Sequence, residues 1–238
     1  MSRFSLLICL LVALSILSMV SANPRVLAAV ITCVPATPCN GTDDNDTING
    51  SNQIDQMNGL GGKDRMFGNA GADNMKGGDG ADWIDQDELW DNASNVISGG
   101  GDGDTIDGGN ADDTINGDDG ADSLYGYGGN DRIRGGIGDD ILQGLQANDR
   151  LEGGDGNDVL TGDWDTGPIS LYGADNLKGG PGDGRLFQSA VSTEGPITVI
   201  TPDGFKDILD CGDGNDEAWG NVSTDHDEFR NCEVVHRG

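Results

Sequence analysis

A nine-residue period runs through most of this chain and limits what it can fold into. Seventeen nonapeptide units lie between Gly41 and Trp219, interrupted at residues 86–89, 162–169 and 188–201. Position 8 of the unit is apolar in all seventeen, position 6 is Asp in fifteen, and position 1 is Gly in thirteen. An acidic, glycine-rich sequence without structure would not keep its apolar residue at one position. The period therefore describes a repeated structural unit.

The placement of the single apolar residue decides the type of structure. An amphipathic helix needs three or four apolar residues per two turns, so a helix is excluded. Positions 7 to 9 predict a short strand whose middle residue faces inward, and positions 1 to 6 predict a glycine-rich turn. Two units then close one 18-residue coil. We expect an all-β parallel β-roll, or β-solenoid, in which stacked coils enclose a narrow core of Ile, Leu and Met side chains.

The units GGDGNDVLT (153–161) and GGDGADWID (77–85) match the pattern GGxGxDxUx, where U is apolar. This pattern resembles the RTX (haemolysin-type) calcium-binding repeat. The resemblance covers roughly residues 41 to 219. It implies a parallel β-roll with calcium ions held in the turns between adjacent coils.

The residue types in the turns also favour calcium. Calcium takes six to eight oxygen ligands from carboxylates and backbone carbonyls, which glycine-rich turns with a terminal Asp supply. Stacked turns let one ion take oxygens from two coils. The predicted metal-binding residues are Asp46, Asp55, Asp64, Asp73, Asp82, Asp104, Asp113, Asp122, Asp131, Asp140, Asp149, Asp158 and Asp175. The most regular units hold Asp73, Asp82, Asp104, Asp122, Asp131, Asp140 and Asp158, whereas Asn95 and Gly184 replace the aspartate.

The charge balance narrows the choice of partners. The chain has 42 acidic and 13 basic residues, a formal net charge of -29. Nucleic acids and anionic membranes are therefore poor partners, and cations are the natural ones. Nine of the basic residues lie inside the units, and none of these occupies positions 1 to 4 or position 6. Seven of the nine are therefore expected on outward strand faces, away from the first four turn positions and the row of aspartates.

The N-terminus has the features of a secretory signal peptide. Arg3 precedes the apolar run 4–17, and Val20-Ser21-Ala22 forms a small-residue cleavage pattern. We expect residues 1–22 to be removed, with cleavage after Ala29 or an uncleaved anchor helix as alternatives. The chain is then secreted or extracellular, and it has no membrane span once the signal is cleaved.

Four cysteines remain after the signal peptide: Cys33, Cys39, Cys211 and Cys232. An even number in an exported chain fits two disulfides, and four cysteines allow three pairings. We favour Cys33–Cys39 and Cys211–Cys232, because each pair brackets one end of the repeat region.

The predicted organisation has four parts. Residues 1–22 form the signal peptide and 23–40 an N-terminal cap with Cys33 and Cys39. Residues 41–187 form the β-roll with short insertions. Residues 188–238 hold an irregular insertion, two further repeat-like units and a C-terminal cap with Cys211 and Cys232.

The predicted function is an exported, non-enzymatic calcium-binding protein. The sequence has two histidines, no HExxH pair and no GxSxG motif, and its non-repeat segments are too short for a catalytic domain. One alternative is a calcium-stabilised cell-surface or carbohydrate-binding module, in which the outward-facing Trp83, Tyr125 and Trp219 stack on sugars. A second alternative is an accessory part of a secreted hydrolase.

Overall fold

The structure, a computed structural model, describes residues 28–35, 37–86, 92–163, 174–189, 206–220 and 226–237. Within these ranges the chain forms twenty-one strands and no helix. None of the described residues therefore belongs to a helix that could cross a membrane. The predicted signal peptide lies outside the described residues.

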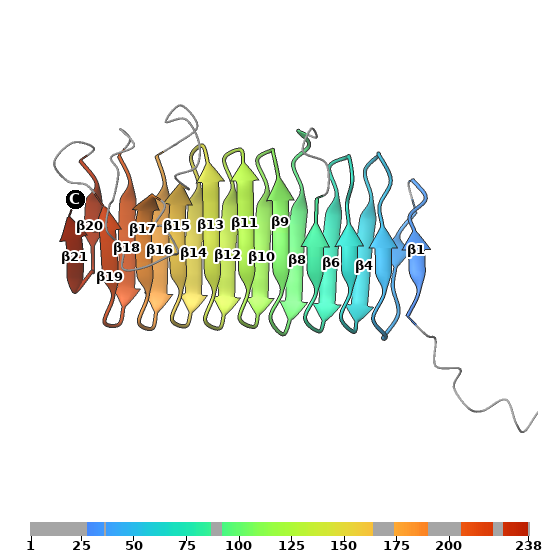
Figure 1. Cartoon of the computed structure of the whole chain (residues 1–238), viewed down its shortest axis with the longest axis horizontal. Helices are drawn as coiled ribbons and strands as arrows, with labels where there is room; N and C mark the ends of the chain where they lie inside the picture. The colour runs from blue at the N-terminus through green and yellow to red at the C-terminus, as the bar shows by residue number, and fades with distance from the viewer. Residues whose placement is uncertain are drawn as a thin grey trace, which may run out of the picture.

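The strands form two parallel sheets that face each other along a rod (Figure 1). The 11-stranded sheet contains β1 (Val30–Thr32), β3 (Thr47–Asn49), β5 (Arg65–Phe67), β7 (Trp83–Asp85), β9 (Thr105–Gly109), β11 (Ser123–Gly128), β13 (Ile141–Gln146), β15 (Val159–Asp163), β17 (Arg185–Ser189), β19 (Glu217–Gly220) and β21 (Val234–Arg237). The 10-stranded sheet contains β2 (Cys39–Asn40), β4 (Gln56–Gly61), β6 (Asn74–Asp79), β8 (Val96–Gly101), β10 (Thr114–Asp119), β12 (Arg132–Ile137), β14 (Arg150–Asp155), β16 (Asn176–Pro181), β18 (Ile208–Asp213) and β20 (Glu228–Arg230).

The register confirms two nonapeptides per coil. Ile115 of β10 pairs with Ile133 of β12, and Leu124 of β11 pairs with Leu142 of β13, each 18 residues further on. Successive units therefore alternate between the two sheets. The predicted all-β parallel β-solenoid is confirmed.

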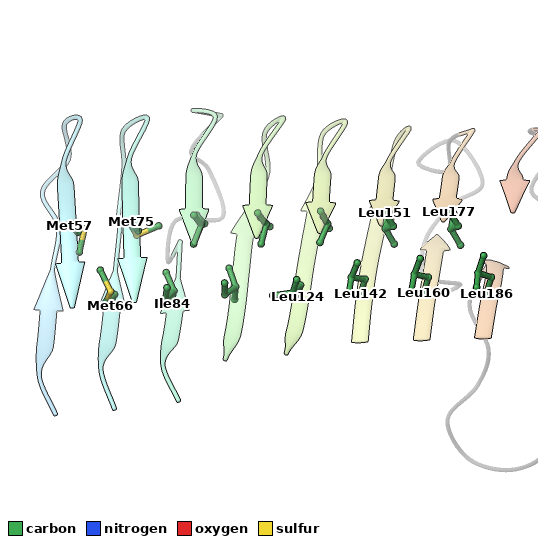
Figure 2. Close-up of a cluster of buried hydrophobic side chains, with 14 of the residues drawn as sticks. Met57, Met66, Met75, Ile84, Leu124, Leu142, Leu151, Leu160, Leu177 and Leu186 are labelled. Atoms are coloured by element: carbon green, nitrogen blue, oxygen red, sulfur yellow. The ribbon is translucent and has the colours of Figure 1, made fainter. Parts of the chain in front are cut away.

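The core is a double row of position-8 side chains between the sheets. Every position-8 residue is at most 2% exposed, including Leu142 and the smallest, Ala218. Figure 2 shows these side chains pointing from both sheets into the space between them. Because each coil contributes two such side chains, the core is narrow and continuous along the rod.

The strands are longer than the sequence predicts. Ten of the twenty-one do not end at position 9 but continue through positions 1 to 3 of the next unit, as in β10 (Thr114–Asp119). The backbone there pairs in register with the next coil, Asp118 with Gly136 and Asp119 with Ile137. Position 2 has positive φ, 76° at Asp118 and 130° at Gly136, which a regular strand does not contain. Glycine thus permits an irregular strand here, where the prediction placed only a turn.

The ends of the chain continue the solenoid. The segment predicted as an N-terminal cap supplies β1 and β2, which pair with β3 and β4. The C-terminal segment supplies β18 to β21. Disulfides join Cys33 to Cys39 and Cys211 to Cys232, so the favoured pairing is confirmed.

The connections between the sheets form two edges of the rod. The short-turn edge holds the connections from an even-numbered to the next odd-numbered strand, at the bottom of Figure 1. It consists of residues 41–46, 62–64, 80–82, 102–104, 120–122, 138–140, 156–158, 182–184, 214–216 and 231–233. The insertion edge holds the connections in the other direction. Its described residues are 33–35, 37–38, 50–55, 68–73, 86, 92–95, 110–113, 129–131, 147–149, 174–175, 206–207 and 226–227.

Candidate metal centre

The position-6 aspartates lie inside the corners of the solenoid. All thirteen predicted metal-binding aspartates are buried, with exposures of 1 to 3%. The fold divides them between the edges. Asp46, Asp64, Asp82, Asp104, Asp122, Asp140 and Asp158 lie on the short-turn edge, and Asp55, Asp73, Asp113, Asp131, Asp149 and Asp175 lie on the insertion edge.

Along each edge the aspartates form a hydrogen-bonded ladder. The backbone N–H of Asp104 donates to Oδ1 of Asp122 at 2.7 Å, and that of Asp122 donates to Oδ1 of Asp140 at 2.8 Å. On the insertion edge Asp113 donates in the same way to Asp131 at 2.8 Å. One carboxylate oxygen per residue is therefore engaged in joining neighbouring coils.

The second carboxylate oxygen has no such role in at least nine of the thirteen aspartates, nor in Asp216 at position 6 of the last unit. It is buried and finds no hydrogen-bond donor in Asp64, Asp82, Asp104, Asp113, Asp122, Asp131, Asp140, Asp149, Asp158 and Asp216. A buried carboxylate oxygen without a donor or cation is costly. These rows of oxygens therefore need a proton or a positive ion.

Burial raises the pKa of these carboxyl groups. The pKa of Asp104 is raised to about 8, first by desolvation and then by repulsion from Asp82, Asp122 and Asp102, against the lowering effect of the backbone hydrogen bond from Asp82. Desolvation also raises the pKa of Asp140 to about 7. Repulsion from Asp175 adds to desolvation at Asp149 and raises its pKa to about 10. A bound cation would remove this repulsion and stabilise the ionised form.

The contacts of Asn95 show which groups surround the second carboxylate oxygen of a position-6 aspartate. It replaces aspartate at position 6 and keeps the ladder, since its Oδ1 accepts from Asp73 N–H at 2.9 Å and its own N–H donates to Asp113 at 2.6 Å. Its Nδ2 donates to the carbonyls of Ala93 at 3.2 Å and Gly108 at 3.4 Å. The place of the second carboxylate oxygen is thus lined by carbonyl oxygens, which together with a carboxylate suit a hard cation such as calcium.

Side-chain ligands alone do not complete such a site. No group of three or more His, Cys, Asp or Glu side chains in the described parts of the chain converges as a metal cluster. Calcium bound in these turns would take oxygens from the position-6 carboxylate and from backbone carbonyls. Nitrogen and sulfur ligands are not part of this set.

The ladder includes residues beyond the thirteen. Asp175 N–H donates to Asp207 at 2.7 Å, Asp207 N–H to Asp227 at 3.2 Å, and Gly184 N–H to Asp216 at 2.6 Å. Asp207 and Asp216 occupy position 6 of the last two units, so the period was the signal for them. Asp227 follows an interruption and had no such signal.

The aromatic residues that carried the carbohydrate-binding alternative are less available than expected. Trp219 is only 8% exposed and is stacked between Phe187 and His236, with ring centroids 4.6 and 4.5 Å away. The guanidinium of Arg65 lies 4.3 Å from the ring centroid of Trp83. The expectation of an open row of outward aromatics is therefore wrong at Trp219, because the ring packs against its neighbours along the sheet.

Comparison with known proteins agrees with this geometry. The chain matches the family described as RTX calcium-binding nonapeptide repeat (4 copies) over residues 40–75, 67–85, 91–124, 98–133, 107–142 and 134–166. These segments together span just over half of the chain. The chain belongs to the RTX calcium-binding repeat family. Calcium is accordingly the expected ion of this RTX protein. No curated protein matches the sequence.

Proposed function

We propose that this RTX protein is an exported, non-enzymatic calcium binder whose β-roll folds when calcium binds. The observation that carries the proposal is the row of buried carboxylate oxygens without donors, such as those of Asp104, Asp122 and Asp140, in the turns of a calcium-binding repeat. A divalent cation supplies the charge and coordination that these oxygens lack.

Coupling of binding to folding follows from the composition. The chain carries a net charge of -29, and each nonapeptide buries one apolar side chain. That burial is small against the entropy of ordering nine residues, at about 1–2 kcal/mol per residue for the backbone alone. Carboxylate repulsion adds to the cost. Calcium bound between coils neutralises charge and joins neighbouring turns, so its binding free energy becomes folding free energy.

Export is supported by the N-terminal sequence and by the cysteines. Arg3 with the apolar run 4–17 fits a signal peptide, and disulfides such as Cys33–Cys39 persist in oxidising compartments. Extracellular calcium modules bind with Kd of about 0.1 to 1 mM, which matches calcium outside cells. The chain would then stay unfolded before export and fold afterwards.

The non-enzymatic role is supported by the structural tasks that the described residues already perform. The described residues belong to coils of the solenoid and their turns, and the position-6 carboxylates serve the ladder. His236 stacks on Trp219, and His226 lies at the start of the C-terminal coil, so the two histidines do not form a pair on one turn. The acidic residues therefore have a structural explanation.

A calcium titration of the secreted protein tests the proposal. Calcium-depleted protein at pH 7.5 should show a disordered circular dichroism spectrum and a large hydrodynamic radius. Millimolar calcium should produce β signal and compaction in one transition. Magnesium at the same concentration should act poorly, because it demands tighter octahedral geometry. Depleted protein that is already compact and β-rich would refute folding on calcium, and unchanged spectra without bound calcium would refute calcium binding.

A further inference from the structure

The outer face of the 10-stranded sheet carries a basic patch in an otherwise acidic protein. Strands β12, β14 and β16 are neighbours in this sheet (Figure 1). Positions 7 and 9 of these strands point outward, and four of the six side chains there are basic: Arg132, Arg134, Arg150 and Lys178. All four are exposed. Four of the 13 basic residues of the chain thus lie on three adjacent strands.

The same three coils present a different surface on the 11-stranded sheet. Positions 7 and 9 of β13, β15 and β17 hold one charged residue among six: Ile141, Gln143, Val159, Thr161, Arg185 and Phe187. Basic residues that served only solubility would have no reason to gather on one face. The basic patch is therefore a property of one side of the rod.

The arrangement of the arginines is unfavourable for the fold. The parallel register places Arg132 directly beside Arg150. Neighbouring strands lie about 4.8 Å apart, and like charges directly opposite each other destabilise a sheet. Among the described residues, no carboxylate lies within salt-bridge distance of Arg132, Arg134 or Arg150. Guanidinium groups are thus held together on the surface without a paired anion.

Glu152 shows how a carboxylate behaves within the patch. Its Oε1 lies 2.9 Å from Nζ of Lys178. The hydrogen bond from Lys178, with the charges of Lys178, Arg134 and Arg150, holds the pKa of Glu152 below its usual value, although partial burial acts in the opposite direction. This one carboxylate engages Lys178 and leaves the guanidinium groups unpaired. An added carboxylate would find the same stabilisation at the arginines.

Toward the insertion edge, the basic patch borders neutral amides. Asn130 and Asn148 are exposed and stand two residues before Arg132 and Arg150. The backbone N–H and Nδ2 of Asn148 donate to Oδ1 of Asn130 at 3.3 and 3.0 Å. Amide groups both donate and accept hydrogen bonds, which suits the hydroxyl groups of a sugar.

Toward the short-turn edge, the basic patch borders acidic residues. A hollow of about 370 Å³ is lined by Arg134 together with Asp118, Asp119 and Asp155. A broad, densely charged polymer such as duplex DNA, with one charge per about 1.7 Å, would lie against these aspartates. A thin chain with widely spaced charges can follow the arginines across the strands instead.

We propose that the basic patch binds an acidic polysaccharide that runs across β12, β14 and β16, with its carboxylates on Arg132, Arg150 and Arg134. Guanidinium groups pair with carboxylates through two parallel hydrogen bonds, which a lysine does not offer. This inference rests on the proposed function, because it needs the folded and exported protein, in which bound calcium offsets part of the net charge of -29.

Matched polymers and matched variants test the assignment. Fluorescence anisotropy of labelled carboxymethyl dextran measures binding to the full-length secreted protein in saturating calcium, and unmodified dextran of the same length lacks only the carboxylates. The wild type should bind the carboxylated polymer alone, and this binding should weaken several-fold between about 50 and 200 mM salt. Arg132→Gln with Arg150→Gln should raise Kd about tenfold, because two charged contacts are lost. Arg65→Gln with Arg185→Gln removes the same charge from exposed positions of the other sheet and should change Kd by less than about twofold.

Circular dichroism of the same samples separates binding from folding. The Arg132 and Arg150 double variant should melt at the wild-type temperature or above it, because repulsion between like charges is removed. Equal loss of affinity in the two double variants, equal binding of both polymers, or tighter binding of single-stranded DNA would overturn the assignment. Wild-type protein that is β-rich in calcium yet binds neither polymer would overturn this inference and leave the proposed function intact. Protein that stays disordered in calcium would overturn the proposed function itself.

Discussion

Position 1 of the repeat gives a sharp test of how closely the coils are stacked. The unit 126–134 begins with Gly126, and Gly128 follows two residues later in the same strand, β11. An alanine Cβ at Gly126 would collide with Oδ2 of Asp131 and lie 2.8 Å from the carbonyl oxygen of Gly144 in the next coil. At Gly128 the nearest atoms would be Asn110 Oδ1 at 3.4 Å and Asn110 Cα at 3.6 Å, which is ordinary contact.

The expected cost of Gly126→Ala has two parts. Overpacking in a dense interior costs about 1–3 kcal/mol. Moving Asp131 aside would also weaken the hydrogen bond that its Oδ1 accepts from Asp113 N–H at 2.8 Å, worth about 1.5–3 kcal/mol to a charged acceptor. Alanine also restricts the unfolded backbone more than glycine does, which stabilises the folded state by about 0.4–1 kcal/mol. We therefore expect a net loss of about 2–5 kcal/mol. Gly128→Ala should be neutral or stabilising by about 1 kcal/mol at most.

Thermal unfolding in saturating calcium measures both variants. For a chain of this size, about 1 kcal/mol corresponds to roughly 2–4 °C in Tm. Gly126→Ala should thus lower Tm by about 4 to 20 °C, while Gly128→Ala should leave it unchanged or slightly higher. Equal Tm values for the two variants would show that the coils are not packed as described.

Three further outcomes are expected. Leu142→Ala should lower the free energy of unfolding in urea by about 2–5 kcal/mol, and Leu142→Met by less than about 1.5 kcal/mol. Methionine is tolerated because it already fills position 8 at Met57, Met66 and Met75. Similar losses for the two variants would contradict a dense core. Replacing Cys211 and Cys232 with serine should lower the free energy of unfolding by about 3.3 kcal/mol, and replacing Cys33 and Cys39 by about 2.2 kcal/mol. The disulfides close loops of 21 and 6 residues, and the longer loop restricts the unfolded chain more. The reverse order of stability in melting experiments would contradict this entropic reasoning. Calcium-depleted protein should gain β signal as pH falls from 8 to 5. Burial raises the pKa of Asp104 from 3.8 to about 8 and that of Asp140 to about 7, so the folded state binds more protons than the unfolded state in that window and its stability falls as pH rises. A circular dichroism spectrum independent of pH would argue against buried carboxyl groups.

The nine-residue period predicted the position-8 core and the 18-residue coil, because the period follows the side chains that must be buried. The position-8 residues, from Ile48 to Ala218, are all buried, and successive ones lie on alternating sheets. The disulfide pairing followed from the same frame, since each pair lies beside one end of the repeats. These features depend on side-chain pattern alone.

The features that the sequence did not predict depend on backbone stacking. Gly136 has weak strand propensity, so the continuation of β12 through positions 1 to 3 has no signal until a neighbouring coil pairs with it. The exposed ladder in which Asn148 N–H and Nδ2 donate to Asn130 Oδ1, 18 residues away, also arises only from stacking. The burial of Trp219 depends on Phe187 and His236 from adjacent strands, which the position of Trp219 within its unit does not reveal.

Two units per coil also restrict how a gene for such a rod can change length. Loss of a single nonapeptide, such as 117–125, would move every later unit to the opposite sheet. The turn that ends at Asp140 would then join the insertion edge, and the interruption at 188–201 would open between short turns. Duplication or loss of 18 residues keeps each unit on its own side. Lineages of this rod should therefore lengthen and shorten by whole coils, and single-unit changes should survive only beside an end.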